Sequence, residues 1–445
     1  MARSPLPRQA LPLLPLLALV GLALALPVGA SASPGRSYVP GEVLVKYKGG
    51  TSTRAQASAA SAVGTGGAVG PPAASKRLEL RAGTSVAGAV HKLRRDPRVE
   101  YAVPNYIAHA SGLVPDDPAF RLQWNLSGAN GINMPDAWNL AKARRGPGGK
   151  GVTVAVLDTG VAYQRYKRFR RAPDLQRFAK GYDFMDGDSH PNDDNGHGTH
   201  VAGTIAQTTG NKVGTAGIAY RAKIMPVRVL NERGEGDTVA IAQGIRYAAR
   251  RGADVINLSL EFRPSVRAAE IPNIISALRY ARRRGAVVVA AAGNTAGASV
   301  AYPARAPTVI GVSATTIRGC LADYSNSGLD ADLAAPGGGY DAALSDNPYD
   351  AKACQPDLKG ASIYQQTFTS SVRSFGLPGE YMGTSQASPH VSGVAALLIA
   401  TKRLGRNPSP RAIESRLKET ARDIGAPGRD SHYGYGLLDA RAALR

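Results

Sequence analysis

Cysteine and long apolar runs are scarce in this sequence of 445 residues. Two cysteines occur, Cys320 and Cys354, and no C-x-x-C pair or nearby Cys/His cluster supplies the four ligands of a tetrahedral zinc site. Beyond residue 32, no run reaches the roughly 18 apolar residues that a membrane-spanning helix needs. Hydrophobic residues still make up 43% and charged residues 20%. The chain can therefore bury a sizeable core, and wholesale disorder, collagen and a coiled coil are excluded.

Acidic residues are outnumbered by basic ones. Lys and Arg number 54 against 33 Asp and Glu, a formal net charge of +21. A basic surface attracts anionic partners without specifying any of them. Charge alone does not establish nucleic-acid binding, and we expect no specific nucleic-acid partner.

The first 32 residues are typical of a secretory signal. Arg3 and Arg8 precede an apolar run at residues 11–28, and an A-x-A cleavage pattern follows at 30–32. The alternative is a membrane anchor, but prolines within the run and small residues at its end favour removal. We therefore expect a secreted protein, extracellular or periplasmic, with no membrane attachment once the signal is removed.

An even number of cysteines in an exported chain favours a disulfide between Cys320 and Cys354. The alternative is two buried thiols.

The remaining chain has two parts of different character. Residues 33–110 contain a strand-like segment at 43–47 and a Gly/Ala/Ser-rich stretch at 58–74, which predicts a small α+β unit. From residue 151 on, apolar runs alternate with segments of helical period. The runs are 152–157, 224–230, 254–258, 286–291 and 308–312, and the helical segments include 237–251 and 268–284. This alternation predicts an α/β fold, a doubly wound, mostly parallel sheet flanked by helices.

Four polar residues stand where such a fold places its sites, beyond the carboxyl ends of strands. Asp158 ends the run 152–157 in D-T-G, and Asn294 follows the run 286–291 in A-A-G-N. His197 opens H-G-T-H-V-A-G-T, and Ser385 lies in G-T-S-Q-A-S-P-H.

These residue types together suit nucleophilic catalysis. A serine hydroxyl such as that of Ser385 needs an imidazole to accept its proton, and His197 would be oriented by the carboxylate of Asp158. The Asn294 side chain and the Ser385 backbone N–H would hold the developing oxyanion. The chain order Asp, His, Ser and the absence of G-x-S-x-G distinguish this set from α/β-hydrolases. We interpret His200 and His390 as packing residues.

Residues 43–445 resemble the subtilisin-like serine proteases, or subtilases, through the motifs D-T-G, H-G-T-H-V-A-G-T, A-A-G-N and G-T-S-x-A-S-P-H. The resemblance implies a secreted, monomeric serine endopeptidase that cleaves protein or peptide substrates through an acyl-enzyme and needs no catalytic cofactor. Residues 33–110 resemble the inhibitory propeptide of that family, which ends V-E-Y-x-x-P-N. By analogy they act as an intramolecular inhibitor until self-cleavage between about residues 108 and 118, leaving residues 111–445 as the catalytic domain.

The resemblance also suggests a substrate site. Two segments look like the edges between which the family holds an extended peptide, and others suggest a small, apolar primary pocket. The residues concerned are Ser259, Leu260, Glu261, Gly234, Gly236, Ala292 and Gly293. Main-chain pairing predicts broad specificity. Glu261 stands where the family commonly has glycine. It either favours a basic substrate residue or points into water, and we favour the second.

An acidic loop precedes His197. Its spacing resembles the calcium loop of thermitase-like members, and hard oxygen ligands suit Ca²⁺. The expected ligands of this structural calcium ion are Asp183, Asp186, Asp188 and Asn192, with the backbone carbonyl of His190. The alternative is a solvated acidic loop.

A protein of another class remains possible at this stage. It would be a non-catalytic exported protein of the same fold that binds peptides or polyanions. Because each predicted catalytic position is filled, the enzyme is the favoured interpretation.

Overall fold

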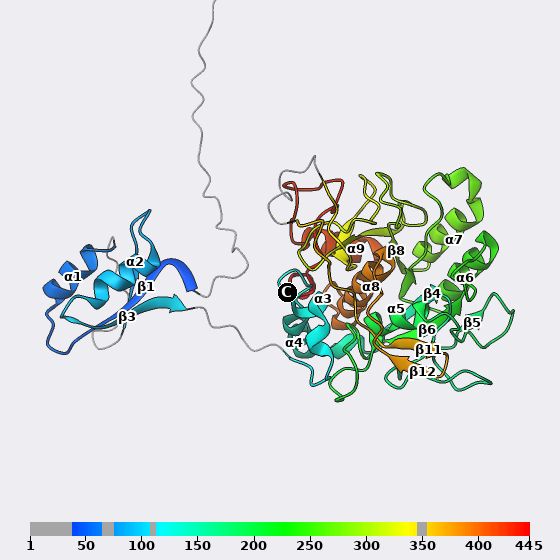
Figure 1. Cartoon of the computed structure of the whole chain (residues 1–445), viewed down its shortest axis with the longest axis horizontal. Helices are drawn as coiled ribbons and strands as arrows, with labels where there is room; N and C mark the ends of the chain where they lie inside the picture. The colour runs from blue at the N-terminus through cyan, green and yellow to red at the C-terminus, as the bar shows by residue number, and fades with distance from the viewer. Residues whose placement is uncertain (1–37, 65–74, 107–112, 345–353) are drawn as a thin grey trace, which may run out of the picture. The chain divides into compact units, whose positions relative to one another are not determined.

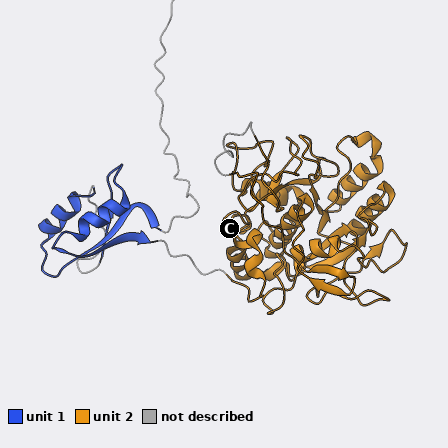
Figure 2. Cartoon of the chain, viewed as in Figure 1, with its two compact units in different colours: residues 1–108 blue, residues 109–445 orange. Residues whose placement is uncertain are grey.

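The computed structural model describes residues 38–64, 75–106, 113–344 and 354–445. The chain forms two compact units, residues 1–108 and 109–445 (Figure 2), which are treated separately below. The predicted signal peptide, most of the Gly-rich stretch and half of the expected cleavage segment lie outside the described residues. Among the described residues, no helix combines the length and apolar character needed to cross a bilayer.

The first unit is a small α+β fold, as predicted. Its elements are β1 (Tyr38–Tyr47), α1 (Thr53–Ser61), β2 (Lys76–Glu79), α2 (Val86–Arg94) and β3 (Val99–Tyr106). The strands form an antiparallel sheet in the order β2-β1-β3. Ser52 and Ser85 cap the two helices, each accepting a hydrogen bond from a first-turn backbone N–H. Val43, Val45 and Leu78 are fully buried in a core that this unit forms by itself.

Among its described residues, the second unit is built on a parallel sheet of seven strands in the order β10-β9-β8-β7-β4-β6-β5. Strands β4, β5, β6 and β8 of this sheet are labelled in Figure 1. The strands are β4 (Thr153–Asp158), β5 (Tyr182–Asp183), β6 (Lys223–Arg228), β7 (Val255–Leu258), β8 (Val287–Ala291), β9 (Ile310–Thr315) and β10 (Leu333–Pro336). Each of the five apolar runs identified in the sequence overlaps one of these strands. The prediction of a mostly parallel sheet is confirmed.

Helices cover both faces of this sheet. They are α3 (Trp124–Ser127), α4 (Met134–Ala143), α5 (His197–Ala206), α6 (Thr238–Arg250), α7 (Pro272–Arg283), α8 (Thr384–Thr401), α9 (Pro410–Glu419) and α10 (Ala440–Leu444). Alternate residues of β4 belong to different cores: Val154 and Val156 pack with α5 and α8, whereas Leu157 packs with α6 and α7. A strand buried on both faces needs a continuous apolar run, which is what the sequence contains.

Some elements differ from the prediction. The segment 268–284 is split into a 3₁₀ turn (Ala268–Glu270) and α7, which begins at Pro272. Proline disfavours helical backbone in the residue before it, so the helix starts at the proline itself. The hairpin β11 (Thr367–Ser371) and β12 (Ser374–Gly376) was not predicted, because its sequence is largely polar and partly exposed.

Cys320 and Cys354 form a disulfide, with their Cα atoms 5.8 Å apart, so the predicted pairing is confirmed.

The order in which strands are added to the sheet reverses at β4. From β4 the chain passes to β5 and β6 on one side, and β7 then pairs with β4 on the other side. The strand order reverses at this point, and crevices for ligands form outside the carboxyl ends of strands where it does so. Asp158, the last residue of β4, lies at this crevice.

Candidate active site

Asp158 and His197 form a hydrogen-bonded pair at the end of β4. The Nδ1 atom of His197 lies 2.7 Å from Oδ1 of Asp158, which also accepts the backbone N–H of Thr159 at 2.8 Å. The Asp158 side chain is fully buried, while that of His197 is 24% exposed. Helix α5 approaches β4 closely at Gly198, where a Cβ atom would lie 2.1 Å from the carbonyl oxygen of Gly160. The glycine after His197 therefore permits this contact.

The surroundings of His197 set its basicity. Burial acts to lower its pKa, but the charge of Asp158, the hydrogen bond to it and the charge of Asp193 together have a larger effect in the opposite direction. The pKa of His197 is therefore raised above its usual value of 6.5. The imidazole is suited to accept a proton, because the resulting cation would face a carboxylate.

Asp193 fixes the start of α5, a role that we did not predict from the sequence. Its buried carboxylate accepts the backbone N–H groups of Asn195, Gly196 and Thr199 and the hydroxyl of Thr199. Burial raises the pKa of Asp193 in spite of these bonds. The sequence did contain a signal for this role: Asp193 stands a few residues before the helix that begins with His197, where a carboxylate can accept the unpaired N–H groups of the first turn.

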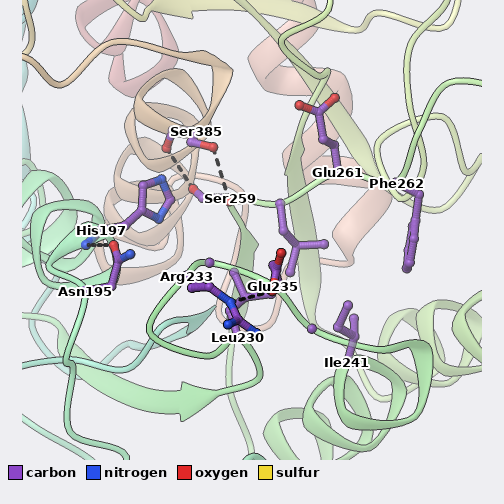
Figure 3. A pocket seen from close by; sticks show the side chains of 13 residues that line it. Asn195, His197, Leu230, Arg233, Glu235, Ile241, Ser259, Glu261, Phe262 and Ser385 are labelled. Atoms are coloured by element: carbon purple, nitrogen blue, oxygen red, sulfur yellow. Dashed lines mark hydrogen bonds and ion pairs between the residues drawn. The ribbon is translucent and has the colours of Figure 1, made fainter.

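Ser385 lies in the first turn of α8 and faces the same pocket as His197 (Figure 3). Its hydroxyl donates to the carbonyl of Ser259 at 3.2 Å, and the Ser259 hydroxyl donates to the carbonyl of Ser385 at 2.8 Å. The Ser385 hydroxyl is thus bonded to Ser259 here, not to His197. Catalytic hydrogen bonds are often absent or long in free enzymes, and rotation about the Cα–Cβ bond reorients a serine hydroxyl.

Asn294 is oriented by the first residue of α8. Its Oδ1 atom accepts both the backbone N–H and the hydroxyl of Thr384, at 2.8 and 3.0 Å. Its amide nitrogen points away from Thr384 and donates a long hydrogen bond of 3.4 Å to Oε1 of Glu261. The backbone N–H of Ser385 belongs to the first turn of α8, where N–H groups have no acceptor within the helix. The predicted oxyanion donors therefore stand at one helix terminus.

Glu261 is partly exposed and is hydrogen-bonded to Asn294, a contact that neither interpretation of its sequence position included. Both carboxylate oxygens accept the backbone N–H of Asn294, at 3.0 and 3.1 Å, and Oε1 lies 3.4 Å from the Asn294 side-chain nitrogen. The carboxylate fits because Gly293 has no side chain: a Cβ atom there would lie 2.3 Å from Oε2 of Glu261. A carboxylate thus lies beside the predicted oxyanion donor.

His197, Ser385 and Glu261 line a pocket with a volume of about 520 Å³, whereas Asp158 and Asn294 are not among its lining residues. It is lined by Asn195, His197, Leu230, Arg233, Gly234, Glu235, Gly236, Ile241, Ser259, Leu260, Glu261, Phe262 and Ser385. Five of the seven predicted substrate residues are among them. Ala292 is fully buried behind the pocket, and Gly293 lies next to it only through its contact with Glu261. The other six lining residues were not among the predicted site residues, since no motif marks them: Asn195, Leu230, Arg233, Glu235, Ile241 and Phe262.

The acidic loop contains a positive side chain that we did not predict. The guanidinium of Arg228 donates to Asp183 at 3.0 Å and to Asp186 at 2.9 Å, and its other nitrogen contacts Asp194 at 3.0 Å. Asp183 on β5 and Arg228 on β6 are partners in the sheet register. Among the described residues, no three carboxylates of this loop come within 4.8 Å of one another as metal ligands. The predicted five-ligand calcium site therefore does not fit this arrangement as a whole.

The other predicted calcium ligands are not bound to Arg228. Asp188 accepts the backbone N–H of His190 at 2.7 Å, and the His190 carbonyl accepts the N–H of Asn192. Asn192 is 2% exposed, and neither its side-chain oxygen nor its side-chain nitrogen has a hydrogen-bond partner. A buried, unpaired amide is costly and indicates a missing partner.

His200 and His390 are buried structural residues. His200 bonds the carbonyl of Ile363 and stacks on Tyr381, and burial lowers its pKa to about 3. His390 bonds the carbonyl of Gln386 within α8, and burial lowers its pKa to about 4. Both rings are neutral at ordinary pH and stay outside the pocket, as we interpreted them.

Comparison with known proteins agrees with this geometry. Residues 149–436 match the family model of the subtilases, and residues 26–105 match the fervidolysin N-terminal prodomain. A thermophilic serine proteinase of a Bacillus species is 35% identical over 92% of this chain and 88% of its own length. Thermitase of Thermoactinomyces vulgaris is 35% identical over 74% of this chain and 99% of its own. A solved protease structure from Pseudoalteromonas arctica, 35% identical, covers 74% of this chain and 98% of its own, with a TM-score of 0.60.

The chain belongs to the subtilase family. It is a subtilisin-like serine protease preceded by a prodomain, so its substrates are peptides and its prodomain is an inhibitor.

Proposed function

We propose that this protein is a secreted endopeptidase in which Ser385 is the nucleophile, His197 the general base and acid, and Asp158 the orienting carboxylate. The observation that carries the proposal is the Asp158–His197 pair at 2.7 Å, facing one pocket with Ser385. The raised pKa of His197 supports the same role, because its protonated form is stabilised where the reaction generates it.

The reaction follows from these positions. The Ser385 hydroxyl turns from Ser259 toward His197, gives its proton to Nε2 and forms a bond to the substrate carbonyl carbon. The negative oxygen is held by the Asn294 amide and the Ser385 N–H. His197 then donates the proton to the leaving amine as the C–N bond breaks. Water, activated by the same imidazole, hydrolyses the acyl-enzyme and restores the Ser385 hydroxyl.

The pocket walls suit an extended peptide. Gly234 and Gly236 on one side and Ser259 and Leu260 on the other line the pocket. Exposed backbone of this kind pairs with a peptide main chain regardless of sequence. We infer that affinity along the peptide is broad and comes mainly from such pairing.

We further propose the processing of the chain: residues 1–32 are a signal peptide, 33–110 the inhibitory propeptide, and 111–445 the mature, monomeric catalytic domain. The propeptide region has its own buried core, which supports independent folding. The disulfide Cys320–Cys354 is consistent with export to an oxidising compartment.

A serine-directed fluorophosphonate tests the catalytic assignment. We expect it to abolish casein hydrolysis and to label Ser385, because this hydroxyl is the only one beside the His197 imidazole in the proposed mechanism. Labelling is located by mass spectrometry of the digested protein. Casein hydrolysis that persists in fully treated enzyme, or label on another residue, would contradict the proposal.

We also propose that calcium binds to a smaller set of groups than the sequence predicted: Asp188, the His190 carbonyl and Asn192. The unpaired, buried amide of Asn192 supports this, since its oxygen needs a partner. Asp183 and Asp186 are not in this set, because each forms an ion pair with Arg228.

Chelation tests this smaller site. In enzyme inactivated by fluorophosphonate, which prevents autolysis, excess chelator is expected to lower the Tm by roughly 3–5 °C. The variant Asn192→Ala should have a lower Tm than the unmodified protein but lose this sensitivity. A chelator-independent Tm in the unmodified protein, after prolonged incubation, would remove calcium from the account.

A further inference from the structure

Glu261 is a carboxylate without a cationic partner in the active-site pocket. Its partners are the backbone and side-chain amides of Asn294. Within the described part of the chain, no Lys, Arg or His lies at ion-pair distance from it. Burial raises the pKa of Glu261, which reflects how poorly its charge is compensated there.

The nearby arginines do not compensate the charge of Glu261. Arg233, the cation at the opposite wall, is paired with Glu235 at 3.0 Å, and both side chains are largely exposed. Arg228 is held by three carboxylates of the acidic loop. The Glu261 charge is therefore available to a ligand that enters the pocket.

Its location defines which part of a substrate it meets. Asn294 would hold the oxygen of the attacked carbonyl, and Oε1 of Glu261 lies 3.4 Å from the Asn294 amide nitrogen. Leu260 and Ser259, which precede Glu261, line the pocket with Ser385. The nearest substrate side chain is therefore that of the residue that contributes the attacked carbonyl.

The charge also acts on the transition state. A negative carboxylate beside the Asn294 amide competes with the oxyanion for that donor and repels it. A cationic substrate side chain would draw the carboxylate away from Asn294 and neutralise it. An apolar side chain of equal length would leave both unfavourable effects in place.

We propose that Glu261 makes this protease selective for lysine or arginine at the residue that contributes the scissile carbonyl. The inference rests on the proposed catalytic roles of Ser385 and Asn294. It departs from the small, apolar primary pocket that the sequence suggested.

The propeptide junction lies outside this preference. Residues 107–118 contain neither lysine nor arginine. Self-cleavage there is intramolecular, and tethering supplies an effective substrate concentration that reaches millimolar for short linkers. The junction is therefore cut once per molecule without the charged contact, whereas selectivity applies to substrates cleaved in trans.

Matched peptides measure the selectivity. Chromogenic peptides that differ only by lysine or norleucine before the scissile bond have side chains of similar length, with and without charge. For the unmodified enzyme we expect kcat/KM to favour lysine by about tenfold or more, the size expected for a hydrogen bond to a charged group. In Glu261→Gln, which keeps the size and removes the charge, the ratio should fall to about one.

Two further variants serve as controls for this test. Glu261→Gly introduces the residue common in the family and should also abolish the lysine preference, so a folding defect of one variant does not decide the outcome. Glu232→Gln removes an exposed carboxylate outside the pocket lining and should keep the ratio within twofold. A ratio near one in the unmodified enzyme, or an unchanged ratio in both Glu261 variants, would overturn the proposal.

Titration with the fluorophosphonate distinguishes a wrong role for Glu261 from a wrong assignment of the catalytic residues. If Ser385 is labelled and peptides are cleaved without a lysine preference, only the role of Glu261 is wrong. If Ser385 is not labelled and no peptide is cleaved, the proposed function fails and the inference fails with it.

Discussion

Replacing Ser385 by alanine is expected to leave the precursor uncut between about residues 108 and 118 and to lower peptide hydrolysis by about 10⁴-fold or more. The physical reason is that the acyl-enzyme forms on the Ser385 hydroxyl, while the oxyanion donors and the binding surfaces remain. The other hydroxyl that lines the pocket, that of Ser259, donates to the carbonyl of Ser385. Gel mass and N-terminal sequencing of the purified product measure the processing, and a chromogenic peptide measures the rate.

The unmodified protein, expressed and purified in the same way, is the control. It should appear as a mature chain that begins near residue 111, together with the released propeptide. Replacing serine by alanine removes a single oxygen atom, so the circular dichroism spectrum of the variant should match that of the unmodified protein. If preparations free of host proteases showed the same cut in both proteins, self-cleavage would be wrong.

Replacing Asp158 by asparagine is expected to lower kcat by about 10⁴-fold with little change in structure. The Thr159 N–H and Nδ1 of His197 share Oδ1 of Asp158, so an amide oxygen at that position could still accept from both. The neutral amide would no longer supply the negative charge that stabilises the imidazolium. Asp158 is fully buried, so water cannot take the place of its charge beside the imidazolium, and only the weaker effect of the Asp193 charge remains.

The pH profile carries a second signature of this substitution. His197 must be neutral to act as a base, so activity is lost as the pH falls through its pKa. Asp158, with a smaller contribution from the charge of Asp193, raises that pKa above 6.5, which places the acidic limb of kcat/KM in the unmodified enzyme above pH 6.5. In Asp158→Asn the residual activity should show this limb at lower pH. An acidic limb at the same pH in both enzymes would contradict the assigned pair.

Glu261 links the oxyanion donor Asn294 to the choice of substrate. Asn294 holds the oxyanion in the proposed mechanism and binds Glu261 in the free enzyme. A substrate cation that displaces the carboxylate would therefore affect the rate of the chemical step as well as binding. This predicts that lysine before the scissile bond raises kcat and does not only lower KM.

The charges of the acidic loop that precedes His197 were predicted only in part from the sequence. The spacing of Asp183, Asp186 and Asp188 indicates a cation site, and a cation is indeed present there. It is the guanidinium of Arg228, which stands more than forty positions later in the sequence, on β6. Only the pairing of β5 with β6, which makes Asp183 and Arg228 register partners, brings the charges together.

The sequence by itself determined the fold class, the family and the predicted catalytic set, because these depend on local patterns. Apolar runs of strand length specify a doubly covered parallel sheet, and short motifs around Asp158, His197 and Ser385 specify which strand and helix ends carry polar groups. Tertiary structure alone decided the electrostatic partners: Asp193 beneath α5, Arg228 in the acidic loop, and Glu261 on the amide of Asn294. Such partners lie on different elements, and the Coulomb and hydrogen-bond energies that join them depend on distances of a few ångströms, which spacing along the chain does not encode.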